Sequence, residues 1–502
     1  MNSRIIVWVV FLCTFLGYSQ NAAKLSGRVF LDANQNKIRD KDEKGLANVL
    51  VSNGKAIVKT DALGRYEIKK IAGETVFVIK PSGFQFQLDA SKKLPFYVPY
   101  DQMEQIENYD FPLVFHNEKK PIKMVLLGDT QVDVIDDVHH VAKLVTEELM
   151  DKDIDFIVPL GDLSFDNAFI FKPLSEVLGL IGAPVLYTIG NHDLNWNTTF
   201  NERDKSFKSI FGPSYYAFEY GNQLNVVLNT IYPIGNNNYE GRLDKTQLDF
   251  LTQLIEMEKE TFHSIQIFMH IPLEDMKDKE DLISRLKPFE NVFVAAGHTH
   301  TQYHRYFERK NQKAIHELVA GAVCGSWWQG PHDIDQIPFA LMYDGTPKGY
   351  WTVSIDEQQY DFKYKVSAAA PEKQINITVP NKKEWDILLN DLNDGFIYAN
   401  VFAADESTAV SISIDDGSLV QMKKYNGIDP TVSKLYYLQS KGRFAAESMA
   451  NFPKPETLST HLWRIEIPSN LSVGAHRVKV KAKSSPLNVE VTGNAVLWID
   501  EY

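Results

Sequence analysis

Five short polar segments each follow an apolar run, and their residue types suit metal-dependent chemistry. The segments are Gly128–Gln131, Gly161–Asp166, Gly190–Asp193, His270 and Gly297–His300. Short apolar runs that end in turn-forming residues are typical of buried strands. Because ligand sites in open α/β sheets form where strands end, we expect the five segments to converge on one site.

Carboxylates and imidazoles in one place point to bound cations. Carboxylate oxygens suit hard divalent metals, and imidazole nitrogens suit Zn, Fe and Mn. One carboxylate can bridge two ions about 3.5–4 Å apart, and such a pair can clamp both the attacking and the leaving oxygen of a phosphoryl transfer. Each segment alone has an ordinary alternative, a tight turn for a Gly-Asp pair or a packed core histidine for His270. All five together, each after a strand, favour the metal site.

The sequence between residues 121 and 350 alternates between buried strands and helices. Apolar runs predict strands at Ile122–Leu127, Ile154–Leu160, Val185–Ile189, Ile265–Met269 and Val292–Ala296. Helical spacing of apolar residues predicts helices at Val138–Met150, Ala168–Ile181 and Lys245–Met257. This alternation predicts a layered α/β domain.

Both flanks of this domain have an all-β pattern. From residue 24 to 115, short apolar runs separated by Gly, Asn and Asp predict an N-terminal β-sandwich, followed by a polar linker at 116–120. From residue 351 to 502, alternating strands and turn pairs such as Asp416-Gly417 predict a C-terminal β-sandwich. A chain of 502 residues is too long for one core, which agrees with about three domains.

Residues 1–20 are typical of a secretory signal peptide. Arg4 supplies the positive start, Ile5–Leu16 is an apolar run too short to span a bilayer comfortably, and Gly17-Tyr18-Ser19 offers small residues for cleavage. The alternative is a buried N-terminal helix. We therefore expect a secreted or periplasmic protein, and no later segment is apolar enough to cross a membrane. Cleavage would leave Cys324 as the single cysteine, so no internal disulfide is expected.

The charge balance argues against polyanionic partners. The formal net charge is −13 at pH 7. Binding to nucleic acid depends on Lys and Arg replacing counterions, so no nucleic-acid partner is expected. A small phosphorylated substrate remains compatible, because bound metal ions can supply positive charge locally.

The five segments resemble the motifs of the calcineurin-like metallophosphoesterases, D-x-H, G-D-x-x-D, G-N-H-[E/D], H and G-H-x-H. The resemblance covers residues 121–305. It implies a multidomain chain whose central α/β domain is a four-layer arrangement, a β-sandwich flanked by helices, with metals at one end. The pieces around Trp327 and Asp344 are similar to a branch that joins N-terminal and C-terminal β-domains to this core.

The resemblance also implies a role for each motif residue. The first metal would be held by Asp129, Gln131, Asp162 and His300. Asp162 would bridge to a second metal, held with Asn191, His270 and His298. The nucleophile would be a metal-bridging hydroxide, with His192 assisting at the phosphoryl or leaving oxygen, and either Asp166 or Asp193 would orient His192.

Two departures from the family pattern affect these expectations. Gln131 stands where the family has His, and its neutral amide oxygen is a harder ligand, which would either weaken the first metal site or shift its preference toward Mn or Mg and away from Zn or Fe. Asp166 follows Asp162 by four residues, one more than the common spacing. This longer spacing argues against a pairing of Asp166 with His192.

Two further features are candidate ligand sites. Asp32, Asn34, Asn36, Asp40 and Glu43 occupy positions 1, 3, 5, 9 and 12 of a calcium-type loop, in a region that resembles the β-domains of bacterial surface adhesins. The loop has Lys37 where the motif has Gly, and the alternative is a solvated polar loop. Trp327 and Trp328 lie among glycines and are expected either to bind substrate or to pack a domain interface.

The sequence as a whole predicts an exported, monomeric, two-metal phosphoester hydrolase, either a phosphatase or a phosphodiesterase. Its metals are expected among Mn, Fe, Zn and Mg. Two alternatives remain: a surface binding protein whose phosphoesterase domain is degenerate, favoured by Gln131, and a nuclease of the same family, disfavoured by net acidity.

Overall fold

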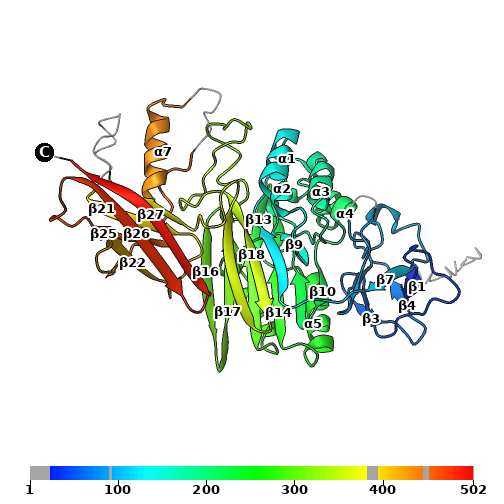
Figure 1. Cartoon of the computed structure of the whole chain (residues 1–502). Helices are drawn as coiled ribbons and strands as arrows, with labels where there is room; N and C mark the ends of the chain where they lie inside the picture. The colour runs from blue at the N-terminus through cyan, green and yellow to red at the C-terminus, as the bar shows by residue number, and fades with distance from the viewer. Residues whose placement is uncertain (1–22, 90–92, 381–393, 445–451, 501–502) are drawn as a thin grey trace, which may run out of the picture.

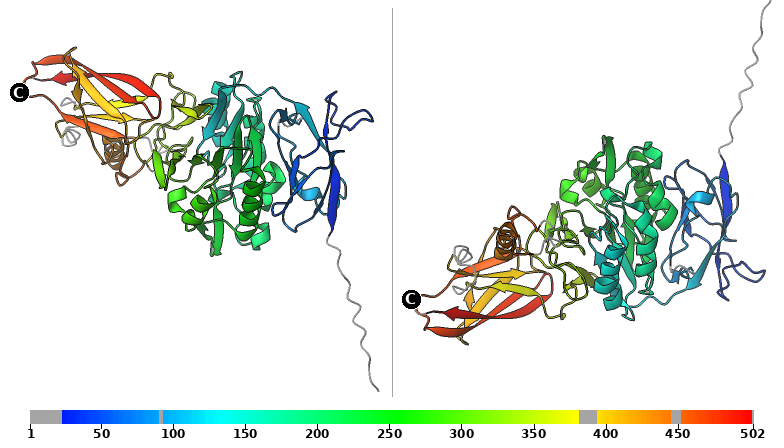
Figure 2. Two further views of the ribbon diagram at one scale, coloured as in Figure 1. Left: turned by 90° about the horizontal axis from the view of Figure 1, so that it is seen from below. Right: turned by 90° about the horizontal axis from the view of Figure 1, so that it is seen from above.

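The computed structural model describes residues 23–89, 93–380, 394–444 and 452–500. The predicted signal peptide, residues 1–20, lies outside the described residues. Three parts of the chain lie in a row, with an α/β part between two β parts (Figures 1 and 2). This arrangement confirms the predicted fold class. Among the described residues, no helix is long and apolar enough to span a membrane.

The N-terminal part consists of two small sheets. One has the order β4 (Arg65–Lys69), β1 (Lys24–Leu31), β7 (Phe111–Phe115), β6 (Phe84–Gln85). The other has the order β3 (Ile57–Lys59), β2 (Leu50–Ser52), β5 (Phe77–Ile79). In β4 buried and exposed side chains alternate, so one face of this strand packs inward.

The central part contains two larger sheets. The first has the order β10 (Tyr216–Tyr220), β11 (Gln223–Val227), β14 (Ser264–Phe268), β15 (Asn291–Ala296), β17 (Gln312–Ala320), β16 (Gln302–Arg309). The second has the order β19 (Gln359–Val366), β18 (Gly349–Asp356), β8 (Ile122–Leu127), β9 (Phe156–Pro159). β14 and β15 are buried along their whole length, as expected for parallel strands covered on both faces.

The predicted boundary at residue 350 falls inside this second sheet. β18 pairs antiparallel with both β8 and β19. Trp351, Val353 and Phe362 are buried in the core that the central and N-terminal parts share. Residues 351–366 therefore complete the central sheet and are not part of the C-terminal β-sandwich.

Most predicted elements of the central part are present, with shifted bounds. The prediction at Lys245–Met257 is confirmed by α5 (Lys245–Glu258), whose N-cap Asp244 accepts a hydrogen bond from the backbone N of Gln247 at 3.0 Å. The prediction at Val138–Met150 corresponds to α1 (Ile135–Val141) and α2 (Glu147–Leu149), joined by the π-helical turn η2 (Ala142–Thr146). Val185–Ile189 makes isolated bridges to Ile157 and Leu160 and forms no strand.

Shorter elements connect the central strands. They are η3 (Ala168–Ile170), α3 (Phe171–Gly179), η4 (Asn191–Asp193), η5 (Phe200–Glu202), α4 (Lys205–Phe211), the hairpin β12 (Ile231–Gly235) and β13 (Asn238–Gly241), η6 (Leu273–Asp275) and α6 (Lys279–Arg285).

The C-terminal part forms two further sheets around its own core. One has the order β20 (Ile375–Thr378), β21 (Phe396–Val401), β25 (Leu462–Glu466), β24 (Lys423–Lys424). The other has the order β23 (Val420–Gln421), β22 (Ala409–Ile414), β26 (Gly474–Ser484), β27 (Val489–Ile499). The helix α7 (Pro430–Ser440) lies beside these sheets (Figure 1).

Candidate functional site

The ends of β8, β9, β14 and β15 bring the predicted metal ligands together. His270 Nε2 lies 3.2 Å from Asp162 Oδ2, 3.2 Å from His298 Nδ1 and 3.1 Å from Asn191 Oδ1. One ligand atom each of Asp162, His270 and His298 lie within 4.8 Å of one another, a spacing that could hold a metal ion. The second predicted ligand group therefore meets at one point.

The first predicted ligand group lies beside it. His300 Nε2 is 3.1 Å from Asp129 Oδ2, and Gln131 Nε2 is 3.2 Å from Asp162 Oδ2. The side chains of Asp129 and His300 are almost fully buried. Because Asp162 contacts residues of both groups, it occupies the position that a bridging carboxylate needs.

A buried carboxylate oxygen at this site has little compensation from the protein. Asp129 Oδ2 is buried and lies 3.1 Å from His300 Nε2, but it accepts no well-aligned hydrogen bond from the described residues. Burying a charged oxygen is costly, and a metal cation held between Asp129 and His300 would offset that cost. The donor set of carboxylate, amide oxygen and imidazole fits divalent cations, so the residues present fit two metals.

The site places unusual demands on the backbone. Gln131, Asp162, His298 and His300 have positive φ angles of 38°, 45°, 76° and 50°. Non-glycine residues seldom adopt this region, and such strain concentrates at functional sites. Gly190 allows the two loops to approach closely. A Cβ at this position would overlap the backbone N and Oδ1 of Asp162.

The charges of these groups are strongly coupled. Burial opposes protonation of His270, but the carboxylates of Asp162 and Asp129 outweigh it and raise the His270 pKa to about 9. Burial and the neighbouring His270 lower the pKa of His298 to about 4. Positive charge is therefore favoured between the two carboxylates, which is the place where a cation would bind.

His192 lies at the edge of this cluster. Its backbone N–H donates to Asp162 Oδ1 at 2.9 Å, and its Nδ1 is 3.1 Å from Asp166 Oδ1. Its side chain is 24% exposed, so substrate can reach the ring. Of the two acidic candidates, the structure brings Asp166 against His192 despite the longer motif spacing.

Asp193 has a different position from the one expected for a partner of His192. Its carboxylate accepts hydrogen bonds from the backbone N of Leu163, Ser164 and Gly190 at 3.0, 2.9 and 2.9 Å. It is almost fully buried. Asp193 therefore ties two ligand-bearing loops together, and its placement corrects the interpretation of it as a catalytic residue.

The two neighbouring tryptophans have different surroundings. The ring of Trp327 lies 5.5 Å from that of His300 and 4.5 Å from that of Phe165. Trp328 instead donates from Nε1 to the carbonyl oxygen of Thr130 at 2.9 Å. Trp327 therefore borders the site, whereas Trp328 packs its own loop against the β8 loop, which corrects its assignment to substrate binding.

Three neighbours of the site were not anticipated from the sequence. The ring of Phe165 lies 4.7 Å from that of His192, and the ring of Tyr239 lies 6.2 Å from that of His298. Cys324 Sγ is 3.8 Å from Gln131 Oε1, and burial raises the pKa of its thiol. Phe165 is inside a recognised motif and could have been noticed, but Tyr239 and Cys324 had no local signal.

The calcium-type loop is closed by its own hydrogen bonds. Asp32 accepts from the backbone N of Asn36 and Lys37 at 3.1 and 2.9 Å. Glu43 accepts from the backbone N of Ala33 and Asp40 at 2.8 and 3.0 Å. The loop thus supplies donors to its own carboxylates, and calcium binding stays a prediction.

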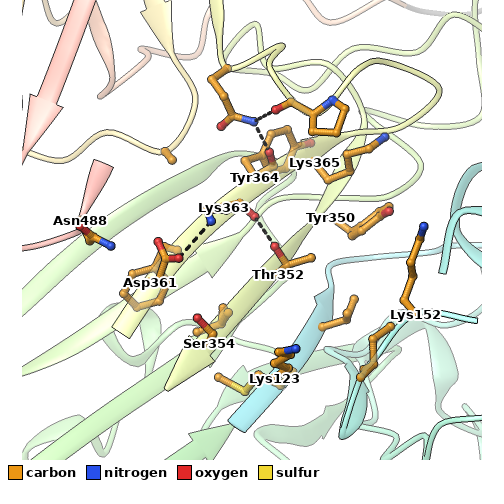
Figure 3. Close-up of a pocket in the computed structure, with 18 of the residues that line it drawn as sticks. Lys123, Lys152, Tyr350, Thr352, Ser354, Asp361, Lys363, Tyr364, Lys365 and Asn488 are labelled. Atoms are coloured by element: carbon orange, nitrogen blue, oxygen red, sulfur yellow. Dashed lines mark hydrogen bonds and ion pairs between the residues drawn. The ribbon is translucent and has the colours of Figure 1, made fainter. Parts of the chain in front are cut away.

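A large groove lies away from the candidate site. It has a volume of about 1150 Å³ and lies between the outer face of β18 and β19 and the C-terminal strand β27. Thr352, Ser354, Asp361 and Lys363 point into it (Figure 3), and Lys363 pairs with Asp361 at 3.1 Å. None of the predicted site residues lines this groove.

Comparison with known families accounts for most of the chain. Residues 122–302 match the model of the calcineurin-like phosphoesterases. Residues 32–116 match the model for the N terminal of calcineurin-like phosphoesterase, and residues 317–485 match the model for its C terminal. No curated protein matches the chain.

Proposed function

The chain belongs to the calcineurin-like phosphoesterase family, with N-terminal and C-terminal extension domains, and we propose from this premise that it is an exported two-metal phosphoester hydrolase. The family match and the candidate metal cluster support a metal-dependent phosphoesterase. The finer points, which are export, the number of metals and the residue roles, are our proposal.

The observation that carries the proposal is the meeting of the two ligand groups at Asp162. Asp129, Gln131, Asp162 and His300 would hold one divalent ion, and Asp162, Asn191, His270 and His298 the other. Such a pair, when bound, would supply a Lewis acid and lower the pKa of the attacking water. The buried Asp129 Oδ2, which accepts no well-aligned hydrogen bond from the described residues and faces His300 Nε2, supports a cation at this point.

The chain's own contribution is proton transfer and orientation. As the oxygen of water bonds to phosphorus, the bond from phosphorus to the leaving oxygen breaks. His192 would give a proton from Nε2 to that oxygen, so that the product leaves as an alcohol. Asp166, 3.1 Å from Nδ1, would orient the ring, and the proton released from water would restore His192.

The proposal also includes the location of the protein, its substrate class, its oligomeric state and its metals. The signal-like residues 1–20 support secretion or a periplasmic location. The substrate would be a small phosphorylated molecule, and the protein a monomer. Mn or Mg would suit the amide oxygen of Gln131 better than Zn or Fe. Calcium would bind in the N-terminal part at the Asp32–Glu43 loop.

The proposal is tested by hydrolysis of p-nitrophenyl phosphate and bis-p-nitrophenyl phosphate. We expect turnover with Mn²⁺ that EDTA abolishes and that Asp162→Asn lacks. The preferred compound then separates a phosphatase from a phosphodiesterase. Turnover that survives EDTA would contradict the proposal. Absence of turnover together with absence of bound metal would identify the degenerate binding protein, and cleavage of single-stranded DNA would identify the nuclease.

A further inference from the structure

The side of the site that carries His192 is lined by aromatic rings. Phe165 and Trp327 contact each other with ring centroids 4.5 Å apart and planes at 73°. The Phe165 ring lies 4.7 Å from the His192 ring, and the Trp327 ring lies 6.2 Å from it. Phe165 is 37% exposed, so its ring is accessible to a ligand. The two rings form an open corner beside His192.

The position of this corner determines which part of the substrate touches it. In the proposed function, on which this inference rests, His192 protonates the leaving oxygen. That oxygen must come within about 2.6–3.2 Å of the donating nitrogen. The atoms attached to it therefore lie against Phe165 and Trp327 and away from the attacking water.

The chemistry of the corner selects among leaving groups. Beside it the carboxylate of Asp166, whose side chain is 51% exposed, lies against His192. With His192 protonated this pair carries no net charge, so an anionic leaving group would lose hydration against the two ring faces without gaining a net positive charge in return. A neutral leaving group with apolar surface would bury the exposed face of Phe165.

The angle between the Phe165 and Trp327 rings restricts the leaving groups further. A flat ring placed in a corner of 73° can stack on one wall and direct its edge at the other, and aromatic pairs favour both arrangements. Each such contact is worth roughly 2- to 12-fold in binding beyond area burial. A saturated ring or a short alkyl group has no flat face with which to make them.

We propose that Phe165 and Trp327 form a leaving-group subsite and that the substrates are phosphoesters whose leaving alcohol carries an uncharged, planar ring directly on the ester oxygen. Phe165 is a specificity-determining residue in this subsite, positioned by the hydrogen bond from its backbone N to the carbonyl oxygen of Val132 at 3.0 Å.

The test compares three phosphonates on the Mn²⁺-loaded full chain, with affinities measured by calorimetry. Phenylphosphonate carries the planar ring, cyclohexylphosphonate carries a saturated ring of similar size, and methylphosphonate reports binding to the metal site alone. Their P–C bonds resist hydrolysis, so the readout is independent of turnover. The variants are Phe165→Leu and Trp327→Leu. The matched control is Phe169→Leu, four residues further along, where the ring is 94% exposed.

We expect phenylphosphonate to bind the unmodified protein about 10-fold tighter than methylphosphonate, equivalent to ~1.4 kcal/mol. This preference should fall to about 2-fold in Phe165→Leu and in Trp327→Leu, and it should persist in Phe169→Leu. Thermal melting of each variant verifies that it is folded.

Three results would overturn the subsite while leaving the proposed function intact, because methylphosphonate would still bind. These are equal affinity for phenyl and methyl ligands, a phenyl preference unaffected by both variants, and cyclohexylphosphonate binding as tightly as phenylphosphonate. If none of the three phosphonates bound the metal-loaded chain, the proposed function itself would be contradicted, and the subsite with it.

Discussion

The Nδ1 atom of His192 lies 3.1 Å from Oδ1 of Asp166, although the two residues are separated by 26 positions and Asp166 stands one residue beyond the common motif spacing. The longer spacing is accommodated because Asp166 adopts a positive φ of 61°. This backbone turn returns the carboxylate to the imidazole and leaves the extra residue, Phe165, exposed at the same rim.

Substitution of the two acidic neighbours should separate catalysis from stability. Asp166→Ala removes a half-exposed carboxylate, so we expect kcat to fall about 10- to 100-fold with the melting temperature nearly unchanged. Asp193→Ala leaves the buried backbone N–H groups of Leu163, Ser164 and Gly190 without an acceptor. At about 1 kcal/mol or more each, the free energy of unfolding should fall by about 3 kcal/mol.

Steady-state kinetics and denaturant unfolding of both variants check this prediction. If Asp193→Ala were fully stable, or if Asp166→Ala unfolded, the assignment of the two carboxylates would be reversed.

Replacement of Gln131 should change the metal preference. In Gln131→His an imidazole takes the place of an amide oxygen beside Asp162. Because imidazole favours Zn and Fe, we expect the ratio of Zn²⁺ to Mn²⁺ affinity to rise about 10-fold. Competition titrations followed by measurement of metal content provide the readout. An unchanged ratio would show that residue 131 does not bind the metal.

The buried histidine pair on β16 and β17 predicts acid sensitivity. His304 Nδ1 lies 2.9 Å from His316 Nε2. The pKa of His304 is lowered to about 3, mainly by burial and secondly by the nearby His461. The pKa of His316 is also lowered, mainly by burial and secondly by His304, against the opposing effect of Asp405. Both residues are thus neutral in the folded chain.

In the unfolded chain histidine takes up a proton below about pH 6.5, whereas the folded pair does not. The folded state therefore loses stability as pH falls below about 6.5, by about 2 kcal/mol per histidine between pH 7 and pH 5. The double variant His304→Gln/His316→Gln should show a smaller loss over this range in denaturant unfolding. The exposed His263, changed to Gln, is the control, and an identical loss in all three proteins would refute the assignment.

The ligand positions could be predicted from the sequence because each depends on local chemistry. An apolar strand followed by a polar, ligand-type residue marks a strand end, and ligand sites of α/β domains form where strands end. Asp129 and Asp162 follow strands of one central sheet and His270 a strand of the other, so their common place could be expected from strand ends and residue types, but not the pairing of the two sheets. The helix α5 was predicted closely for a similar reason, since the helical spacing of its apolar residues is a local signal.

Features that depend on distant pairing could not be predicted in this way. β18 pairs with β8 across more than two hundred residues, and no local pattern distinguishes it from a strand of the next domain. The choice between Asp166 and Asp193, and between Trp327 and Trp328, depends on side-chain direction in loops. Such directions follow from backbone turns like that at Asp166, which composition does not reveal.

The central claim is that two metal ions joined by Asp162 drive phosphoester hydrolysis. The most direct test is a Mn²⁺ titration of metal-free protein, in which bound metal per chain and turnover of p-nitrophenyl esters are measured on the same sample. We predict that turnover saturates at two bound ions and that Asp162→Asn binds fewer ions and lacks turnover. Full turnover at one bound ion, or in the presence of EDTA, would contradict the account.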